Sequence, residues 1–424
     1  MSNTTNNSIR KNEIRVRIAP SPTGIPHIGN SRTALFNYLF ARHNKGKFIL
    51  RIEDTDQKRI VKGAKEAIFE ILDWLGLTPN EVYIQSERLR EYKKHAEQLL
   101  EKGVAYKEKD AIRFEMPKAG ETFWNDLIGN KHISFKNNTQ EDFIIIKSDG
   151  FPTYNFANVI DDHLMEITHV IRGEEFISSM PKHIQLYKSF GWKHPFFAHL
   201  PIVLGPDKTK LSKRHGAKSV LDYRDEGFLK EALINFMVLL GWNPGGNKEI
   251  MDINEMIKLF DVNGVNAASP IFDIKKLEWM NGEYIRMVGN QTLKSALVNF
   301  YKEDNEVISY IESKKVNIDF ILNLAKTRMK TLADFKSLII DTVPAAITPQ
   351  QKTLAQKLIR AYEPIEWKPT MISGVTIAAR NELNMGTADI YTVLMGKPSG
   401  LPFEQKAYAQ GKENIIDWLK KVSS

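Results

Sequence analysis

Two loops that lie far apart in the sequence contain residues that could bind phosphate. The first loop runs from Pro20 to Asn30 and combines rigid prolines and glycine with His27, just before a helical pattern. Backbone N–H groups at a helix N-terminus attract anions, so this arrangement suits a phosphate group. An ordinary strand-to-helix turn with an incidental histidine would show the same residues. The first loop alone therefore does not identify a site.

The second loop runs from Asp207 to Gly216 and is dense in cations. It contains Lys208, Lys210, Lys213 and Arg214, whose charges could neutralise a leaving pyrophosphate. Without context, such a loop is most simply a solvated basic loop. A chemical role therefore depends on the fold bringing the two loops together.

The residues around the first loop predict an α/β nucleotide-binding domain. Residues 15–19 alternate charged and apolar side chains and predict a strand. Residues 31–43 carry apolar side chains at helical spacing, with Asn30 or Ser31 as the N-cap, and Gly46 would end this helix. Residues 48–52 are typical of a buried strand, and the acidic turn 53–56 follows.

The rest of the chain divides into three kinds of pattern. Short strands and turns at 106–147, including 112–114 and 143–146, predict a small insertion, after which the α/β core resumes near Tyr154. A short strand at 201–204 is expected to lead into the second loop. Strand patterns are scarce after Trp279, which predicts a mainly α-helical final third. Helical patterns occupy 63–75, 89–102, 183–190, 228–240, 318–338, 352–362 and 414–422.

Length, charge and cysteine content limit the class of protein. A chain of 424 residues predicts about two to four domains. Its 59 Lys and Arg against 51 Asp and Glu favour polyanionic partners, although many basic proteins bind no nucleic acid. The absence of cysteine excludes disulfides, thiolate catalysis and sulfur-bound zinc. No signal-peptide pattern and no apolar stretch of ~20 residues occurs, so we expect a cytoplasmic protein without a membrane role.

Taken together, the two loops resemble the HIGH and KMSKS signatures of class I aminoacyl-tRNA synthetases, through Pro26 to Asn30 and Asp207 to Gly216. The segments Arg17 to Gly24 and Arg51 to Asp56 resemble bacterial glutamyl-tRNA synthetases in particular. The resemblance extends to residue 290 and fades in the final third. Further matching segments are Pro152 to Ala157, Val159 to His163, Arg172 to Glu175, Leu211 to Ala217, Tyr223 to Gly227, Leu240 to Trp242 and Trp279 to Gly282.

The resemblance implies a fold and a division into domains. The fold would be an α/β Rossmann-like class I catalytic domain with a small α+β insertion, followed by a mainly α-helical anticodon-binding region. Residues 1–100 and 151–205 would form the catalytic domain, and 101–150 a shortened insertion that binds the acceptor end. Residues 206–290 would form a stem-contact domain with the KMSKS-like loop, and 291–424 the anticodon-binding domain.

The resemblance also implies a reaction. The chain would ligate L-glutamate to tRNA(Glu) through a glutamyl-adenylate, releasing AMP and pyrophosphate. ATP would bind with Mg²⁺ held chiefly by phosphate oxygens and water, and no zinc site is expected. No step needs a covalent enzyme intermediate, so positioning and charge stabilisation should provide most of the acceleration. The family further suggests a monomer.

The site residues implied by the resemblance fall into two groups. Near the phosphates, His27, Lys210 and Lys213 would be catalytic. The ATP site would comprise Pro20, His27, Gly29, Asn30, Lys210, Ser212 and Lys213. Arginine pairs best with a carboxylate through its bidentate fork, and a negative residue should hold the substrate ammonium. The glutamate site would comprise Arg17, Ser21, Glu53, Tyr154, Asn158 and Arg172.

Simpler interpretations of these residues remain open. Glu53 and Asp56 could cap a turn, and Tyr154 and Asn158, spaced four apart near a helix start, could serve local packing. Other histidines show no metal-ligand spacing and are expected to be structural or surface groups, and no metal-binding residues are predicted. These histidines are His95, His132, His194 and His199.

The sequence departs from the family pattern in two places. The stretch 106–143 is shorter than the usual insertion and lacks the cysteines that some relatives use for zinc, and Asn30 replaces the second histidine of HIGH. Among related activities, glutaminyl-tRNA synthetase usually ends in β-barrels, and glutamyl-queuosine tRNA synthetase lacks an anticodon-binding region. Three alternatives stay open: a glutaminyl-tRNA synthetase, a glutamyl enzyme that also charges tRNA(Gln), and an inactive RNA-binding paralogue. Intact His27, Glu53, Lys210 and Lys213 argue against the paralogue.

Overall fold

A computed structural model of the chain describes residues 13–212 and 218–424, which form two compact units. Unit 1 contains the described residues up to Asp222 together with Leu233–Ile274. Unit 2 contains Tyr223–Ala232 and Lys275–Ser424. No helix among the described residues is both long enough and apolar enough to cross a bilayer.

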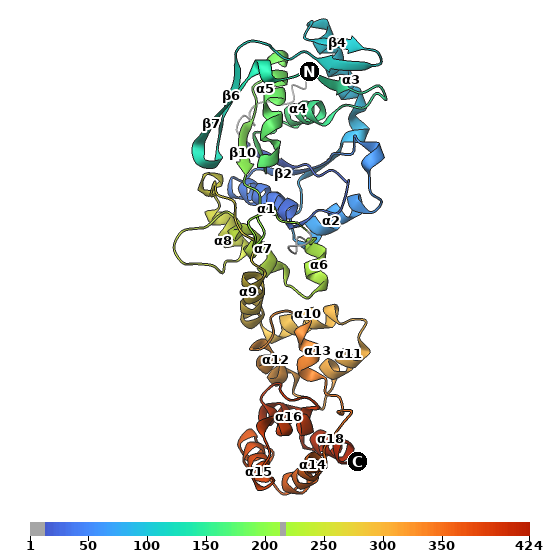
Figure 1. Cartoon of the computed structure of the whole chain (residues 1–424), viewed down its shortest axis with the longest axis vertical. Coiled ribbons are helices and arrows are strands. Elements are labelled where there is room, and N and C mark those ends of the chain that lie inside the picture. The colour runs from blue at the N-terminus through green and yellow to red at the C-terminus, as the bar shows by residue number, and fades with distance from the viewer. Residues whose placement is uncertain (1–12, 213–217) are drawn as a thin grey trace, which may run out of the picture. The chain divides into compact units, whose positions relative to one another are not determined.

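Unit 1 alternates strands with helices, as the expected α/β fold requires (Figure 1). Its strands are β1 (Arg15–Ile18), β2 (Lys47–Ile52), β3 (Glu81–Ile84), β4 (Ala105–Glu108), β5 (Ala111–Phe114), β6 (Glu121–Asp126), β7 (Lys131–Lys136), β8 (Phe143–Ile146), β9 (His169–Gly173) and β10 (Phe196–Leu200). Its helices are α1 (Ile28–His43), α2 (Ala64–Trp74), α3 (Leu89–Glu101), α4 (Tyr154–Leu164), α5 (Met180–Phe190) and α8 (Ile253–Leu259). Three helices cross the boundary between the units, namely α6 (Val220–Asp225), α7 (Lys230–Leu239) and α9 (Ile274–Met287).

Two adjoining sheets form the centre of unit 1. Strands β1, β2 and β3 pair in parallel in the order β1-β2-β3. The second sheet has the order β7-β6-β10-β9, in which β10 is parallel to both β9 and β6. The sheets meet where the Thr168 N–H, just before β9, donates to the Arg15 carbonyl oxygen in β1 at 2.9 Å. Residues that follow β1, β2 and β9 can therefore gather in one place.

The range 101–150, expected as a small insertion, contributes to two different structures. Strands β4, β5 and β8 form a separate antiparallel sheet. The β6–β7 hairpin instead extends the sheet that contains β9 and β10, and Asp126 of β6 is in register with Phe197 of β10. In Figure 1 this hairpin lies beside β10. A part of the expected insertion thus belongs to the central sheet.

Helix α1 begins three residues earlier than the sequence pattern indicates. Its N-cap is His27, whose Nδ1 accepts from the Gly29 N–H at 3.0 Å, while Asn30 Oδ1 accepts from the His27 N–H at 3.3 Å. The prediction of Asn30 or Ser31 as the N-cap is wrong, because the His27 ring accepts the capping hydrogen bond that a Ser, Thr or Asp side chain usually accepts. The last turn ends at Asn44, and a Cβ on Gly46 would lie 2.1 Å from the Ile14 carbonyl oxygen.

The prediction of a strand at 201–204 is also wrong. The ladder with β9 runs over Phe196–Leu200 and stops before Pro201, which has no N–H to donate. Beyond it, Leu204 makes only isolated bridges to Lys210 and Ile271. The apolar run before the second loop is therefore the end of a strand followed by extended chain.

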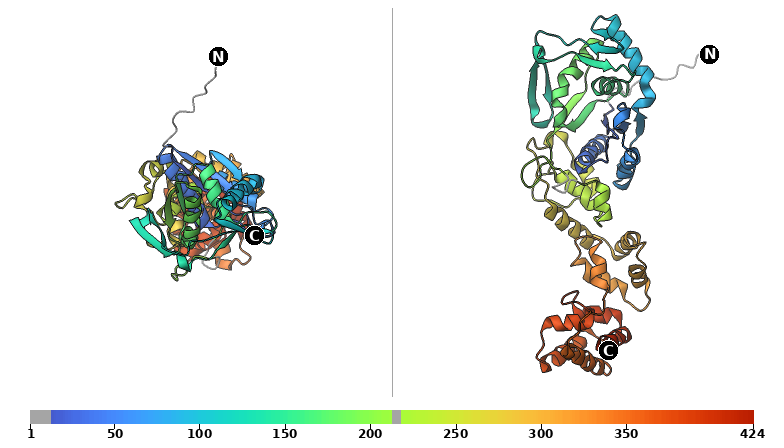
Figure 2. Two further views of the ribbon diagram at one scale, coloured as in Figure 1. Left: turned by 90° about the horizontal axis from the view of Figure 1, so that it is seen from above. Right: turned by 45° about the vertical axis from the view of Figure 1, so that its right-hand side comes forward.

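Unit 2 is helical, as predicted, and no strand occurs among the residues described there (Figure 2). The prediction of one helix over 318–338 is wrong, because this range divides into two helices. The Asp334 carboxylate accepts from the N–H groups of Lys330 and Thr331, and the Leu332 N–H donates to the Gly227 carbonyl oxygen. Because these N–H groups are bonded elsewhere, the backbone does not continue as one helix. The helices are α10 (Asn290–Phe300), α11 (Asn305–Glu312), α12 (Ile318–Lys326), α13 (Asp334–Ile339), α14 (Pro349–Tyr362), α15 (Pro369–Glu382), α16 (Thr387–Met395), α17 (Phe403–Gln410) and α18 (Lys412–Ser423).

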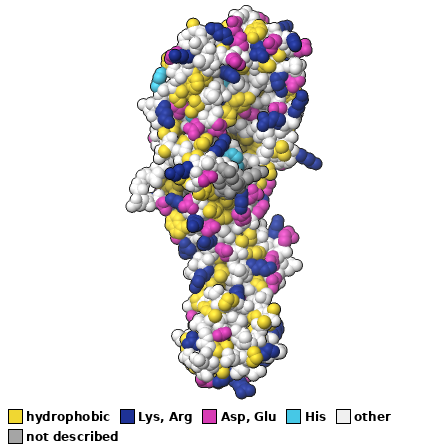
Figure 3. Space-filling model, viewed as in Figure 1, with side chains coloured by type: hydrophobic (Ala, Val, Ile, Leu, Met, Phe, Trp, Pro, Cys, Tyr) yellow, Lys and Arg dark blue, Asp and Glu magenta, His cyan; other side chains and the backbone are white. Residues whose placement is uncertain are grey.

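Two apolar clusters stabilise unit 2, one over α10–α13 and one over α14–α18. A buried ion pair joins the two groups of helices. Lys406 of α17 is fully buried, and its Nζ donates to both carboxylate oxygens of Asp341, which follows α13, at 2.6 and 2.7 Å. On the face shown in Figure 3, Lys and Arg side chains of this unit lie scattered among other side chains, not in one continuous patch.

Candidate functional site

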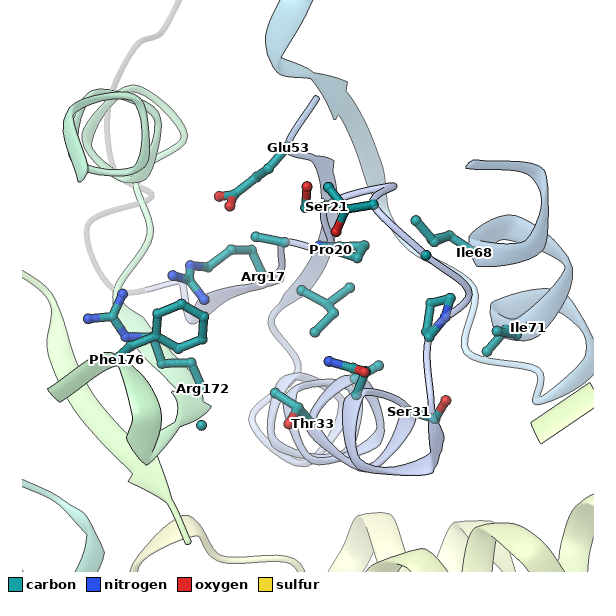
Figure 4. Close-up of a pocket in the computed structure, with 18 of the residues that line it drawn as sticks. Arg17, Pro20, Ser21, Ser31, Thr33, Glu53, Ile68, Ile71, Arg172 and Phe176 are labelled. Carbon is teal, nitrogen blue, oxygen red and sulfur yellow. The ribbon is translucent and has the colours of Figure 1, made fainter. Parts of the chain in front are cut away.

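A cavity of about 420 Å³ lies where β1, the first turn of α1 and β9 come together in unit 1. Its lining includes the loop after β1 and the residue after β2. Figure 4 shows the charged groups of Arg17, Arg172 and Glu53 on one side of this cavity, and Ser31 and Thr33 of α1 on another. Of the residues predicted for the site, those that line the cavity are Arg17, Pro20, Ser21, Asn30, Glu53, Tyr154, Asn158 and Arg172.

A buried network of charged side chains lies beside this cavity. Arg51 of β2 is fully buried, and it donates from Nη1 to Asp162 Oδ1 at 2.7 Å and from Nη2 to Glu53 Oε1 at 3.0 Å. Arg17 of β1 donates from Nε to Asp162 Oδ1 at 3.0 Å. Asp162 of α4 therefore fixes two arginines that come from neighbouring strands.

The neighbouring carboxylate, Asp161, extends the network away from the cavity. It accepts from Arg88 Nε at 2.9 Å, from the Tyr92 hydroxyl at 2.8 Å and from Gln85 Nε2 at 3.0 Å. Three guanidinium groups, those of Arg17, Arg51 and Arg88, thus share the three carboxylates of Glu53, Asp161 and Asp162.

Burial and pairing shift the pKa values of the network in opposite directions. Burial opposes the charge of Arg51, but Asp162, Glu53 and Asp161 together hold its pKa well above the ordinary value. Burial likewise opposes ionisation of Asp162, yet the Arg17 and Arg51 charges outweigh it and hold the pKa of Asp162 below its usual range. Both groups are therefore charged at neutral pH.

Arg172 of β9 is the arginine that the network leaves without a carboxylate. Its Nη1 donates to the Tyr154 hydroxyl at 3.2 Å, its Nε donates to His199 Nε2 at 3.3 Å, and its guanidinium lies 5.2 Å from the centre of the Phe176 ring. Only 5% of Arg172 is exposed, and no Asp or Glu of the described residues lies within salt-bridge distance. Burial lowers its pKa. A buried cation of this kind is stabilised by an anionic ligand.

Glu53 has one oxygen engaged by the protein and one available to the cavity. Oε1 accepts from Arg51 and also from Asn158 Nδ2 at 3.1 Å, whereas no residue of the described chain donates to Oε2. Burial raises the pKa of Glu53 against the opposing charges of Arg51 and Arg17. An ammonium group in the cavity would pair with the remaining oxygen. Turn capping and local packing, the simpler interpretations, do not describe Glu53 and Asn158, which hydrogen-bond to each other across 105 residues.

The two loops that were predicted to bind phosphate approach each other at the start of α1. The Ile28 N–H donates to the Lys218 carbonyl oxygen at 3.0 Å, so the chain that leaves the second loop lies against the first. Burial lowers the pKa of His27, and the charge of Lys210 lowers it further. His27 is therefore neutral, and because Nδ1 accepts from Gly29, its proton resides on Nε2. That N–H can donate to a phosphate oxygen.

The second loop is described only in part. Lys210 is exposed and Ser212 is half-buried, but Lys213 lies outside the described residues. A Cβ on Gly29 would lie 2.8 Å from Cε1 of the His27 ring, so a larger residue there would displace the ring from its capping position. The roles predicted for His27, Gly29, Lys210, Ser212 and Lys213 stay predictions.

Four residues next to the site were not predicted to have a role. Arg51 and Asp162 belong to segments that resemble the family, and this resemblance was the available signal. His199, expected to be structural or on the surface, is buried and contacts Arg172 and Asp126. Nothing in the local sequence of Asp126 or His199 indicates that contact. In the described part of the chain, no three His, Asp or Glu side chains gather as metal ligands.

Comparison with known proteins gives matches over most of the chain. The family described as tRNA synthetases class I (E and Q), catalytic domain, matches residues 13–111 and 107–279. A glutamate–tRNA ligase of Dehalococcoides mccartyi is 44% identical over 77% of this chain and 76% of its own length. A glutamate–tRNA ligase of Elusimicrobium minutum is 36% identical over 97% of this chain and 99% of its own length.

Solved structures give the same picture. The crystal structure of a glutamate tRNA ligase from Elizabethkingia meningosepticum, in complex with its amino acid, superposes with a TM-score of 0.84 at 33% identity. That match covers 97% of this chain and 99% of the other. A glutamate–tRNA synthetase from Elizabethkingia anophelis superposes with a TM-score of 0.81, also at 33% identity, over 97% of this chain and 100% of its own.

Proposed function

The chain belongs to the class I tRNA synthetases of the glutamate and glutamine family, and we propose that it ligates L-glutamate to tRNA(Glu) at the expense of ATP. The relatives that match nearly the whole chain bear the name glutamate–tRNA ligase, which supports this substrate. They include the structure solved with its amino acid. The enzyme therefore forms a glutamyl-adenylate and transfers the glutamyl group to tRNA.

The observation that carries the choice of amino acid is the unpaired charge of Arg172. Arg17, Arg51 and Arg88 share three carboxylates beside the cavity, whereas Arg172 has no acidic partner among the described side chains. The side-chain carboxylate of glutamate would pair with this guanidinium, whereas the side-chain amide of glutamine carries no charge to offer. The side-chain carboxylate would lie against Arg172 and Arg17, and the ammonium against Glu53.

Activation of glutamate would occur between this network and the start of α1. The α-carboxylate attacks the α-phosphate of ATP, the bond to the β-phosphate breaks, and pyrophosphate leaves. The α1 N-terminus, the Nε2–H of His27 and the charges of Lys210 and Lys213 would stabilise the negative charge that builds up on the phosphates. Pro20, Gly29, Asn30 and Ser212 would shape the nucleotide pocket, with Mg²⁺ bound to phosphate oxygens and water.

Transfer to tRNA would follow at the acyl carbon. A ribose hydroxyl of the tRNA end attacks the glutamyl carbonyl carbon, and AMP leaves. A second cavity of about 590 Å³ adjoins the first, sharing Ser21, Thr23, Glu53 and Tyr154, and offers space beside the acyl group. The helical residues 291–424 would bind the anticodon stem. We expect the enzyme to act as a cytoplasmic monomer.

The test measures pyrophosphate exchange and charging with glutamate and with glutamine. Purified tRNA(Glu) and tRNA(Gln) are supplied separately, because members of this family typically need tRNA to activate their amino acid. We expect exchange and charging with glutamate and tRNA(Glu) only. Charging of tRNA(Gln) with glutamate would identify a non-discriminating enzyme, and use of glutamine would identify a glutaminyl enzyme. No exchange with either tRNA would contradict the proposal and favour an RNA-binding paralogue.

A variant links this test to Arg172. Arg172→Gln removes the unpaired charge and should raise the KM for glutamate by about a hundredfold, with a much smaller change in the KM for ATP. Arg42→Gln is the matched control. Arg42 lies in the last turn of α1, whereas the cavity is at the first turn, and it bonds to Asn80 and Thr78. An equal loss in both variants would remove Arg172 from the glutamate site.

A further inference from the structure

Arg172 is connected to a buried pair of side chains on the two neighbouring strands of its sheet, β10 and β6. His199 of β10 accepts from Arg172 Nε through its own Nε2 at 3.3 Å. The other ring nitrogen, Nδ1, lies 2.5 Å from Asp126 Oδ2 of β6. Only 4% of His199 and 2% of Asp126 are exposed. The three residues form a chain of hydrogen bonds across β6, β10 and β9.

The donors and acceptors in this chain allow one protonation pattern. An arginine Nε always carries a proton, so His199 Nε2 must accept, and a carboxylate only accepts, so His199 Nδ1 must carry the imidazole proton. Burial lowers the pKa of His199 despite its hydrogen bond to Asp126. Burial raises the pKa of Asp126, but the hydrogen bond from His199 outweighs burial and holds this pKa below its ordinary value. A neutral imidazole between a carboxylate and a guanidinium satisfies all of these requirements.

Asp126 is itself held so that it cannot turn. Its Oδ1 accepts from the backbone N–H groups of Ile128 and His199, each at 3.1 Å, which leaves Oδ2 to face the imidazole. Trp124 Nε1, at 3.5 Å, is the other donor near Oδ2. The register of β6 on β10 places this carboxylate opposite the residue two positions before His199. The sheet therefore sets the direction of the histidine ring.

We propose that Asp126 and His199 are positioning residues that fix the tautomer of the imidazole and, through it, the orientation of the Arg172 guanidinium toward the amino-acid cavity. With Nε bound to His199 and Nη1 to Tyr154, the plane of the guanidinium is defined. Pre-organising a planar, bidentate donor reduces the ordering that a carboxylate must impose when it binds. The inference rests on the proposed role of Arg172 in binding glutamate.

The isosteric variant Asp126→Asn gives the sharpest test. The two backbone N–H groups would hold the amide oxygen of the new side chain in the place of Oδ1, so its NH₂ group would face His199 Nδ1. The imidazole proton would then move to Nε2, where it opposes the Arg172 Nε–H donor-to-donor. The glutamate KM should rise about tenfold or more, while the ATP KM stays within about twofold.

The matched control is Thr122→Val on the same strand. Thr122 is fully buried and bonds to Asn137 and Gln185, so its loss disturbs a buried hydrogen-bond network of β6 that has no bond to Arg172. We expect a lower melting temperature but an unchanged KM for glutamate. An equal rise of this KM in Thr122→Val and Asp126→Asn would overturn the positioning role, as would an unchanged KM in Asp126→Asn.

Two variants of His199 keep the test independent of how well Asp126→Asn folds. In His199→Gln, the amide oxygen occupies the place of Nε2 and can still accept from Arg172, whereas His199→Leu offers no acceptor. The KM for glutamate should be close to wild type in His199→Gln and raised about tenfold or more in His199→Leu. Equal values in the two variants would contradict the inference.

Nitrogen-15 NMR of histidine-labelled enzyme separates this inference from the proposed function. The signal lost in His199→Gln assigns the residue. In wild type it should report a neutral ring protonated on Nδ1, and in Asp126→Asn a ring protonated on Nε2. A wild-type ring protonated on Nε2, or on both nitrogens at neutral pH, overturns the arrangement even if glutamate is the substrate. Absence of glutamate exchange in the wild type instead counts against the proposed function.

Discussion

The Glu53 carboxylate divides its two oxygens between the protein and the cavity. Oε1 is bound by Arg51 and Asn158, and Oε2 is left for a ligand. Burial raises the pKa of this group, so it takes up a proton at a higher pH than an exposed glutamate would. Only the ionised form can pair with the ammonium of an amino acid.

The first prediction therefore concerns pH. As the pH is lowered from neutral, protonation of Glu53 should remove the ammonium partner at a higher pH than for an exposed glutamate, and the KM for glutamate should rise while that for ATP changes less. The measurement is steady-state exchange as a function of pH. Glu53→Gln, which cannot ionise, should begin with a high KM and show a flatter profile. A variant with the wild-type pH dependence would show that another group controls it.

Lys213 gives a second prediction at the residue scale. Lys213→Ala should lower the rate of adenylate formation by about a hundredfold or more, because a charge that stabilises the leaving pyrophosphate is lost. Affinity for tRNA, measured by titration, should change far less. Lys213→Arg keeps the charge and should recover part of the rate. Equal losses of rate and tRNA affinity would contradict a role at the phosphates.

Residues with a recognisable motif could be predicted, and residues that act through long-range contacts could not. Arg17, Glu53 and Arg172 were predicted by resemblance, and the structure places them around one cavity. The partner of Arg17, Asp162, is 145 positions away, and that of His199, Asp126, is 73 positions away. Such pairs follow from strand order and register, which one sequence does not reveal.

Among the elements, α1 has as its N-cap a side chain, His27, for which we also propose a chemical role. His27 caps the helix through Nδ1, and Nε2 takes no part in the cap. Asparagine is a strong N-cap residue without an imidazole, and alanine is a poor one. The two functions of His27 can therefore be separated by substitution.

The third prediction uses this difference. His27→Asn should keep the stability of unit 1 but lose most of the exchange activity, whereas His27→Ala should lose that activity and also about 1 kcal/mol of unfolding free energy. Thermal unfolding and pyrophosphate exchange give the two readouts. Full activity in His27→Asn would mean that the ring serves the helix alone.

Periodicity predicted the existence of the elements better than their ends. The strand expected at 201–204 was placed too late, because a proline without an N–H ends the ladder at Leu200. The helix expected over 318–338 spans a break in the structure. The break arises because Asp334 accepts from two backbone N–H groups and the Gly227 carbonyl oxygen accepts from a third. Both errors arise from hydrogen bonds that hydrophobic spacing does not encode.

At the scale of the whole molecule, the helical unit depends on one buried ion pair. Burial lowers the pKa of Lys406 and raises that of Asp341, so burial alone disfavours both charges, and each is stabilised chiefly by the other. Lys397 Nζ, 3.8 Å from Asp341 Oδ1, adds a weaker contact. Removing one partner leaves the other charge buried without compensation.

The fourth prediction tests this dependence. Lys406→Met should destabilise unit 2 by about 3–5 kcal/mol, and the double variant Lys406→Met with Asp341→Leu should recover much of the loss. Calorimetry of thermal unfolding measures the change. Binding of glutamate in unit 1 should stay at the wild-type level in both variants, and charging should fall with the stability of unit 2. A single variant as stable as wild type would show that the pair is solvated.

The hairpin that joins the central sheet limits how freely this enzyme can be rearranged. Because β6 is paired with β10, its residues form part of the scaffold that surrounds the arginine of β9. Exchanging residues 121–136 for the corresponding stretch of a related enzyme would look like a peripheral graft. Such a chimaera would also replace the anchor behind the substrate pocket, so amino-acid selectivity would be inherited partly from the donor of the hairpin.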